Sequence, residues 1–221
     1  LAHTRSDNKI KQSVFKLKES QYAVHLVRDS EMKLVLGQLR KRRDILLYKM
    51  LYLTGARIQE VLDLEIEAIP VPDMSKSICV LHQIRSTGKC RDLYVPMSLI
   101  AELDEFIMEE RSRIATDHSY IFVSEQERQR GKQLTYSAVY DKLKKIQAQV
   151  GVQFNFHDLR HTFCSNLVES GLDVSVVRII MGHEHISTTQ RYTHLSNHYI
   201  EDSLSRYWCQ SSLIGDDFHV E

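Results

Sequence analysis

The chain reads H-D-L-R-H-T-F at residues 157–163, then M-G-H at 181–183, then S-T-T-Q-R-Y-T-H at 187–194. Together these strings offer a guanidinium, several imidazoles and a phenol, which are the groups needed to hold a phosphodiester and attack it. The sequence pairs them with no Gly-rich phosphate loop and no carboxylate cluster for a divalent metal. The combination indicates phosphoryl transfer through a tyrosine, and we expect no metal and no other cofactor.

Helical spacing groups the first of these side chains. His157 and Arg160 are three residues apart, so on a helix both project from one face. His161 lies one turn beyond His157, and this i, i+4 pair has the spacing of zinc ligands. The general-base glutamate of an H-E-x-x-H site is absent, however, and an arginine between two zinc ligands is electrostatically unfavourable. A zinc site is therefore the weaker interpretation, and His161 taken alone is expected to be a hydrogen-bonded core residue.

Tyr192 is the candidate nucleophile. A lone tyrosine on a helix usually packs half-buried, but Thr188, Thr189 and Gln190 make the surroundings of this one polar. A free phenol has a pKa of about 10, so only about a thousandth of it is ionised near neutral pH. As a nucleophile it needs a base within reach and positive charge around the target phosphate. The histidines and arginines supply both.

Periodicity and turn residues predict an α+β fold that is mainly α, a helical domain carrying a small antiparallel β-sheet. Ser30 is expected to cap a long helix that reaches residue 53, bends or breaks at residues 40–43, and ends at Gly55 in a left-handed conformation. The expected strands are 77–84 and 92–95, joined by a turn at 86–89, with a short strand at 120–123. The other expected helices are 56–64, 99–114, 135–150, 157–169, one that follows Asp173 and ends before Gly182, a short one that contains Tyr192, and 197–208.

Length and composition describe an ordinary globular chain. Its 221 residues, 43% hydrophobic and 26% charged, are enough to bury one large core. No run approaches the length that spans a bilayer and no basic-then-apolar leader is present, so we expect no membrane partner and a cytoplasmic location. The cysteines lack C-x-x-C spacing and are expected to be free thiols; they are Cys79, Cys90, Cys164 and Cys209.

Charge is unevenly distributed although its sum is zero. Residues 1–60 hold 13 Lys and Arg against 6 Asp and Glu, a surplus of seven positive charges. Residues 201–221 hold one basic residue against five acidic ones, a surplus of four negative charges. This asymmetry fits a protein with one surface that faces a polyanion, although chance surface charge explains it equally well.

The strings quoted above, together with T-G-A-R-I-Q-E-V-L-D-L at 54–64, resemble the tyrosine recombinase (phage integrase) family. The match consists of H-x-L-R-H-T, of L-G-H with Met181 in place of Leu, of S-T-T-Q-x-Y-T-H, and of the family's first arginine motif. These motifs occur in the family's order over most of residues 30–207. The resemblance implies the tyrosine recombinase catalytic fold. It also implies site-specific DNA recombination, for the integration or excision of a mobile element, without metal or ATP.

The resemblance also implies roles for individual residues. Arg57 and Arg160 would bind the non-bridging oxygens of the scissile phosphate, which suits the planar fork of guanidinium. His157 would accept the proton of Tyr192 or help to place the phosphate, and His183 would hydrogen-bond the phosphate as negative charge develops. Attack by Tyr192 would give a 3′-phosphotyrosyl bond and release a 5′-hydroxyl. The ester keeps the bond energy, so religation needs no ATP.

The family's general acid for the leaving 5′-oxygen is a lysine in a β-hairpin turn. Lys89 in T-G-K-C-R-D-L-Y-V-P is the best match for it. The hairpin is about one residue shorter than in common members of the family, so an ordinary solvated turn lysine stays the alternative. Arg85 and Arg91 flank the turn and cannot readily serve as acids, because guanidinium hardly deprotonates.

We divide the chain into an N-terminal arm or linker (1–22), the catalytic domain (23–208) and an acidic C-terminal tail (209–221). About 30 residues precede the first catalytic helix, too few for the helical core-binding domain with which family members complete a clamp around DNA. We therefore expect the core-binding domain to be absent from this chain. The chain would then hold the chemistry but bind DNA weakly.

The partners implied by the resemblance are double-stranded DNA recombination sites and further copies of the protein, as a tetramer on two duplexes in the bacterial nucleoid. Accessory DNA-bending proteins are compatible with this assembly. The helix at 197–208 is expected to dock its apolar face on a neighbouring protomer, or alternatively on its own domain. Two other classes stay open: a DNA-binding regulator that has lost catalysis, and a metal-dependent hydrolase that uses the histidines. A type IB topoisomerase would share the chemistry but not the R-H-T and S-T-T-Q-x-Y-T-H strings.

Overall fold

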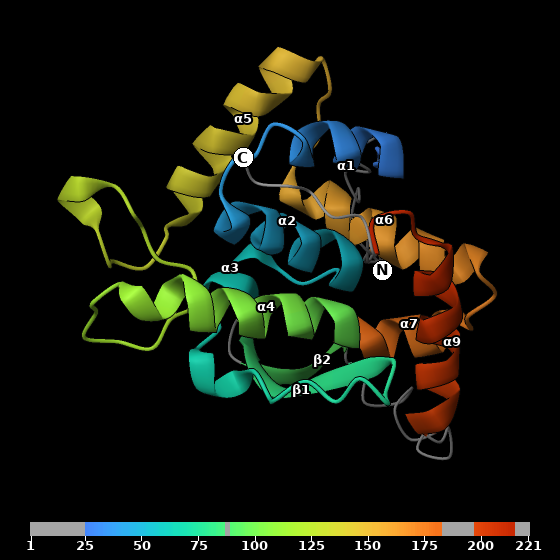
Figure 1. Ribbon diagram of the computed structural model, residues 1–221. Helices are drawn as coiled ribbons and strands as arrows, with labels where there is room; N and C mark the ends of the chain where they lie inside the picture. The colour runs from blue at the N-terminus through green and yellow to red at the C-terminus, as the bar shows by residue number, and fades with distance from the viewer. Residues whose placement is uncertain (1–24, 87–88, 183–196, 215–221) are drawn as a thin grey trace, which may run out of the picture.

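The computed structural model describes residues 25–86, 89–182 and 197–214, and in these residues helices surround one central helix and pack on a two-stranded antiparallel sheet (Figure 1). The central helix is α2 (Arg42–Thr54), in which every residue from Arg43 to Thr54 is buried. A helix buried on all sides must be covered by other elements. Most of the described elements are helices and the sheet has two strands, which confirms the mainly helical α+β fold class. The elements with the most extensive contact to α2 are α3 (Ile58–Leu62), α4 (Met97–Glu109), α6 (Phe156–Glu169) and β2 (Lys89–Pro96).

The long helix expected from residue 30 is two helices. Helix α1 (Asp29–Leu36) begins after Arg28, whose backbone amide donates to the Glu31 carboxylate, so Ser30 lies inside the first turn and does not cap it. Residues 37–41 separate α1 from α2. Gly37 ends α1, and its low helix propensity favours the break there.

Gly55 ends α2 in the left-handed conformation that the sequence predicts, with φ of +59°. A Cβ atom at this position would lie 2.5 Å from Cδ1 of Phe163 on α6, closer than carbon atoms approach each other. Glycine is therefore required twice, for the backbone conformation and for the close approach of α6 to the turn between α2 and α3. This approach places the N-terminal half of α6 beside that turn.

The hairpin is longer than expected and carries a bulge. Strand β1 (Ile78–Ser86) pairs with β2, and residues 87 and 88 of the turn lie outside the described residues. Leu81 pairs with Leu93 and Ile84 with Arg91, so β1 has one residue more than β2 between these pairs. The extra residue changes which face of β1 points inward. Leu81 and Ile84 are therefore both buried although they are three positions apart.

The remaining elements follow the expected order, with shifted ends. Helix α5 (Tyr136–Val150) lies within one residue of the expected range 135–150; Thr135 caps it and Gly151 ends it in a left-handed conformation. Residues 120–123 form only isolated bridges, Glu65 with Tyr120 and Val123 with Gln133, and so the expected short strand was wrong. Helix α4 ends at Glu109, and the 3-10 turn Arg111–Arg113 follows it. Two more 3-10 turns lie at Ile66–Ala68 and Glu127–Gln129. Asp173 caps the short helix α7 (Val174–Ile180).

The last helix, α9 (Asn197–Gln210), packs on its own domain (Figure 1). Leu204 and Trp208 are buried, and the indole Nε1 of Trp208 donates to the Leu53 carbonyl at 2.8 Å. Tyr207 meets Phe163 edge-on, with ring centroids 5.7 Å apart. In the described residues, the apolar face of α9 thus packs on its own domain, which was the alternative expectation to docking on a neighbouring protomer. Residues 1–24 and 215–221, most of the expected arm and tail, lie outside the described residues.

The four cysteines are free thiols, as expected. Cys79 is buried, Cys164 is half-buried, and Cys90 and Cys209 are exposed. In the described ranges, no helix combines the length and the apolar character needed to cross a bilayer.

Replacing Gly55 with alanine is expected to lower the free energy of unfolding by about 2 kcal/mol or more, since the substitution adds left-handed strain to a clash with Phe163. Gly151→Ala is the matched control. Its φ is +74°, but nothing lies within 4 Å of an added Cβ, so only the strain of about 1 kcal/mol applies. Urea unfolding measures both variants. Equal losses in the two would show that the contact with Phe163 is unimportant.

Candidate functional site

Arg57 lies at the start of α3, two residues after Gly55. Its backbone amide donates to Oε2 of Glu60 at 2.8 Å, and its Nη1 donates to Oε1 of the same carboxylate at 2.8 Å. The side chain is 34% exposed. Glu60 therefore fixes the direction of this guanidinium while part of it stays accessible from solvent.

Arg160 lies on α6 and is buried to 8% exposure. Its Nη1 donates to the Gly55 carbonyl at 2.6 Å, and its Nη2 donates to the Met181 carbonyl. One guanidinium thus joins α6 to the turn after α2 and to the chain that leaves α7. The structure thereby brings Arg57 and Arg160, far apart in the sequence, to the same turn.

Two residues of the site were missed by the sequence reasoning: Glu60 was not singled out, and Arg91 was considered only as a neighbour of the turn. Arg91 on β2 donates from Nε to Oε1 of Glu60 at 3.1 Å and from Nη2 to Oε2 at 2.7 Å. Glu60 is 1% exposed and receives two guanidinium groups. We call Arg57, Arg91 and Arg160 the arginine cluster.

Local signals for both missed residues were present in the sequence. Glu60 lies three residues after Arg57 at the start of a helix, the position from which a glutamate reaches back to the N-cap amide. Arg91 alternates with Leu93 and Val95 on β2, and both of these are buried. The period of two predicts that Arg91 shares their inward face.

The arginine cluster is strongly electropositive. Burial, together with the charges of Arg91 and Arg57, lowers the pKa of Arg160 to about 10 against the opposing effect of Glu60. Burial by itself would raise the pKa of Glu60, but hydrogen bonds and charge from Arg91, followed by those from Arg57, hold it at about 2. At neutral pH three guanidinium groups therefore face one carboxylate. An anion that enters relieves their mutual repulsion.

His157 lies in the first turn of α6, where its backbone amide donates to Oδ1 of the capping residue Asn155 at 2.8 Å. Its side chain is exposed, three residues from Arg160. His161 is exposed as well, so the expectation that it is a core residue was wrong. In the part of the chain that the structure describes, no group of three or more His, Cys, Asp and Glu side chains is placed to hold a metal ion.

Three of the residues expected in the site cannot be placed. His183 and Tyr192 lie outside the described residues, and so does the side chain of Lys89, whose backbone pairs with Ser86 at the end of the hairpin. The chain can be followed to Gly182, where Arg160 already contacts the preceding carbonyl of Met181. The backbone that leads into His183 is therefore bound to the arginine cluster.

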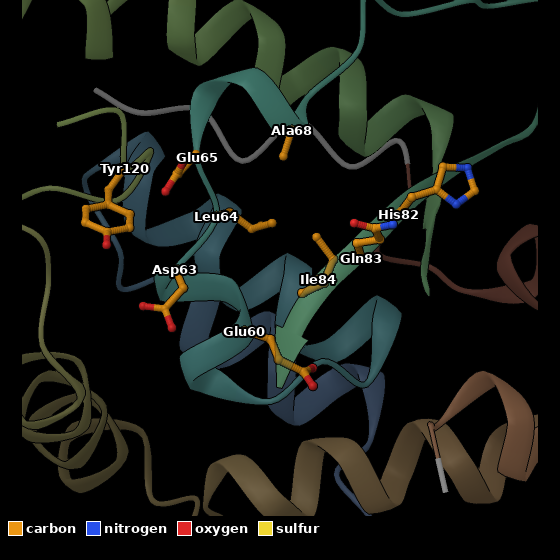
Figure 2. Close-up of a pocket in the computed structure, with 9 residues that line it drawn as sticks. All are labelled: Glu60, Asp63, Leu64, Glu65, Ala68, His82, Gln83, Ile84 and Tyr120. Atoms are coloured by element: carbon orange, nitrogen blue, oxygen red, sulfur yellow. The ribbon is translucent and has the colours of Figure 1, made fainter. Parts of the chain in front are cut away.

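A separate pocket of about 290 Å³ lies between α3, the following 3-10 turn and β1 (Figure 2). Asp63 and Glu65 line it, together with Gln83 of the bulge, which has a φ of +56°. In Figure 2 the carboxylate of Glu60 points away from these two acids. Because the lining is acidic, this pocket does not suit a phosphate, and Glu60 separates it from the arginine cluster.

Comparison with known proteins gives a consistent result. Residues 25–198 match the model of the family described as "Phage integrase family". Transposase A of transposon Tn554 from Staphylococcus aureus is 29% identical over 211 residues, which cover 93% of this chain and 58% of the relative. Tyrosine recombinase XerA from Pyrococcus furiosus is 30% identical over 177 residues, which cover 80% of this chain and 59% of the relative. The chain thus spans less than two thirds of the length of these relatives.

A solved structure shares the fold. The XerH site-specific recombinase, crystallised with its difH substrate in a pre-cleavage complex, superimposes with a TM-score of 0.60 at 23% sequence identity. The superposition covers 82% of this chain and 54% of XerH. The helical domain with its small sheet is therefore the catalytic-domain fold of these recombinases.

Glu60→Gln tests the buried carboxylate. At pH 7 the variant is expected to be less stable than the wild type, because two arginines lose their anion. The folded pKa of about 2 lies below the ordinary value of 4.5, so the stabilisation is complete above pH 4.5 and is lost as the pH falls toward 2. The difference in free energy of unfolding between the wild type and Glu60→Gln should narrow over this range by about 3 kcal/mol.

Urea unfolding at pH 7, 4.5, 3 and 2 measures this gap. The matched control is Glu105→Gln, which removes an exposed partner of Arg42 and should change stability by less than about 1 kcal/mol at every pH. A gap for Glu60→Gln that stays constant from pH 7 to pH 2 would contradict the assigned charge state.

Proposed function

We propose, because the chain belongs to the phage integrase family, that it is the catalytic domain of a site-specific DNA recombinase. The protein would cleave and rejoin DNA strands at recombination sites, to integrate or excise a mobile element. The observation that carries the proposal is the arginine cluster, in which Arg57 and Arg160 meet beside the backbone that leads into His183. A phosphodiester is the anion whose oxygens match such paired guanidinium groups.

The phosphate would bind between Arg57 and Arg160. Among the described residues, two of the five N–H groups of Arg160 donate to the carbonyls of Gly55 and Met181. The other three N–H groups can donate to phosphate oxygens. The carbonyl bonds hold the guanidinium plane before substrate arrives, so little reorganisation is needed when charge develops on the phosphate. The lowered pKa of Arg160 supports this role, since a bound anion offsets the repulsion from Arg57 and Arg91.

The chemical step follows the family's roles. The phenolic oxygen of Tyr192 would attack phosphorus and form a P–O bond, while the bond from phosphorus to the 5′-oxygen breaks. The phenol proton would pass to His157, which is exposed on α6 near Arg160. Lys89 would give a proton to the departing 5′-oxygen, and His183 would donate to the phosphate. Attack by a 5′-hydroxyl on the phosphotyrosyl ester reverses the step and joins the new strand.

The assembly and location belong to the same proposal. We place the active protein in the bacterial cytoplasm on nucleoid DNA, as a homotetramer that holds two recombination sites, with accessory DNA-bending proteins where the site requires them. The basic N-terminal part of the chain supports contact with a polyanion.

The nucleophile is tested with nicked duplexes that cover the ends of the element carrying the gene, incubated with the full-length protein. A nick lets the short 5′-hydroxyl strand diffuse away, so the covalent protein–DNA adduct should accumulate and resist denaturant. Tyr192→Phe should abolish it, because phenylalanine has no nucleophile. Tyr199→Phe is the matched control, an exposed tyrosine of α9 that should leave the adduct unchanged. An adduct that persists in Tyr192→Phe would show that another group attacks.

The phosphate ligand is tested with two substitutions of Arg160. Arg160→Ala should abolish the adduct and also lower the free energy of unfolding by about 2 kcal/mol or more, because two buried carbonyls lose their donor. Arg160→Lys keeps a cation without the planar fork, and should unfold cooperatively yet cleave on the order of 100-fold more slowly. Adduct formation at the wild-type rate by a folded Arg160→Lys protein would count against the assigned contact.

A further inference from the structure

Arg91 is a buried arginine whose donors are directed to protein acceptors. Its side chain is 7% exposed. Nε and Nη2 donate to the two oxygens of Glu60, and Nη1 donates to the Ile180 carbonyl at 2.8 Å. Each of the three guanidinium nitrogens, Nε included, therefore donates to a protein acceptor in the described residues, which favours a positioning role over a direct bond to DNA.

The contact with Glu60 changes the charge of the phosphate site. Glu60 also accepts from the backbone and the guanidinium of Arg57. With Arg91 in place, three guanidinium groups against one carboxylate leave two net positive charges in the cluster. Without Arg91 the sum falls to one, and Glu60 has Arg57 as its remaining guanidinium partner. A carboxylate beside a phosphate ligand would then oppose phosphate binding.

The contact with Ile180 reaches a second part of the site. Ile180 is the last residue of α7, and the next carbonyl, that of Met181, accepts from Arg160. Two arginines from different elements thus hold consecutive carbonyls before His183. A Cβ atom on Gly182 would lie 2.6 Å from Cδ of Arg91, so the chain passes directly against this side chain.

We infer that Arg91 is a positioning residue of the phosphate site: it pairs with Glu60, so that this carboxylate orients Arg57 without cancelling the positive charge of the site, and it fixes the backbone that leads into His183. The inference rests on the proposed function and adds to it a residue that touches neither phosphate nor nucleophile. It acts through Glu60 and Arg57 at α3 and through Ile180 at the end of α7.

Lysine cannot replace Arg91 in this arrangement. The fork supplies two parallel bonds to Glu60 and a third toward α7 in one plane, whereas an ammonium group is a point charge at the end of a flexible chain. Arg91→Lys therefore keeps the charge and loses the geometry. Arg91→Met with Glu60→Gln removes both partners of the ion pair, one charge of each sign, and so also leaves the net charge of the cluster at two.

The test measures single-turnover adduct formation by the full-length protein on the nicked duplexes at saturating DNA, together with the dissociation constant for the same duplexes and the thermal unfolding of each variant. The variants are Arg91→Lys, Arg91→Met, and Arg91→Met combined with Glu60→Gln. The control is Arg178→Met, which removes an exposed charge from α7 and should leave the rate unchanged.

Arg91→Lys should slow adduct formation on the order of 100-fold, with a dissociation constant within about threefold of wild type, since Arg91 does not contact DNA. The combined variant should form adduct at least about 10-fold faster than Arg91→Met, because removing the carboxylate of Glu60 restores the net charge of the cluster from one to two. If Arg91→Met alone does not fold, cooperative unfolding of the combined variant shows the same coupling.

Three results would overturn the inference: a wild-type rate for folded Arg91→Lys, a loss of DNA affinity in that variant as large as its loss of rate, or no gain in the combined variant over Arg91→Met. The second would make Arg91 a DNA contact. Failure of the proposed function is distinguishable, because the wild-type protein itself would then give no adduct on any duplex.

Discussion

A buried carboxylate between two guanidinium groups is the interaction on which the site depends. Glu60 is almost completely excluded from water, and an unpaired charge there would be strongly destabilising. Arg57 from the start of α3 and Arg91 from β2 satisfy it. The same contacts join a helix, a strand and, through Ile180, the end of α7. The same ion pairs therefore stabilise the fold and place the arginines that we propose as phosphate ligands.

Much of the fold could be predicted from local rules. The ends of α2 and α5 follow from Gly55 and Gly151, because a left-handed residue after a helix favours glycine. Contacts between distant segments decided the features that were wrong. The break before α2 accompanies the turning of Arg43 inward to bind Asp44 and the Val123 carbonyl. No pattern within residues 30–53 contains that information.

The site shows the same division. Arg57, His157 and Arg160 could be selected because the sequence resembles the family's motifs at these positions, and the structure places the two arginines together. Glu60 and Arg91 were missed because the local signal for each of them, a capping position and an inward strand position, does not show that the two side chains pair with each other. Arg160 also has a structural role, binding the Gly55 and Met181 carbonyls, that motif spacing does not reveal. Its substitution therefore affects folding and chemistry together.

The bulge in β1 has a consequence for how this hairpin can vary. Ile84 faces Arg91 only because one additional residue lies between Leu81 and Ile84. Deleting that residue would shift the part of β1 after the bulge by one residue, and its inward-facing and outward-facing side chains would exchange faces. Residue counts along this hairpin are therefore a poor guide to which side chains of its two strands lie opposite each other.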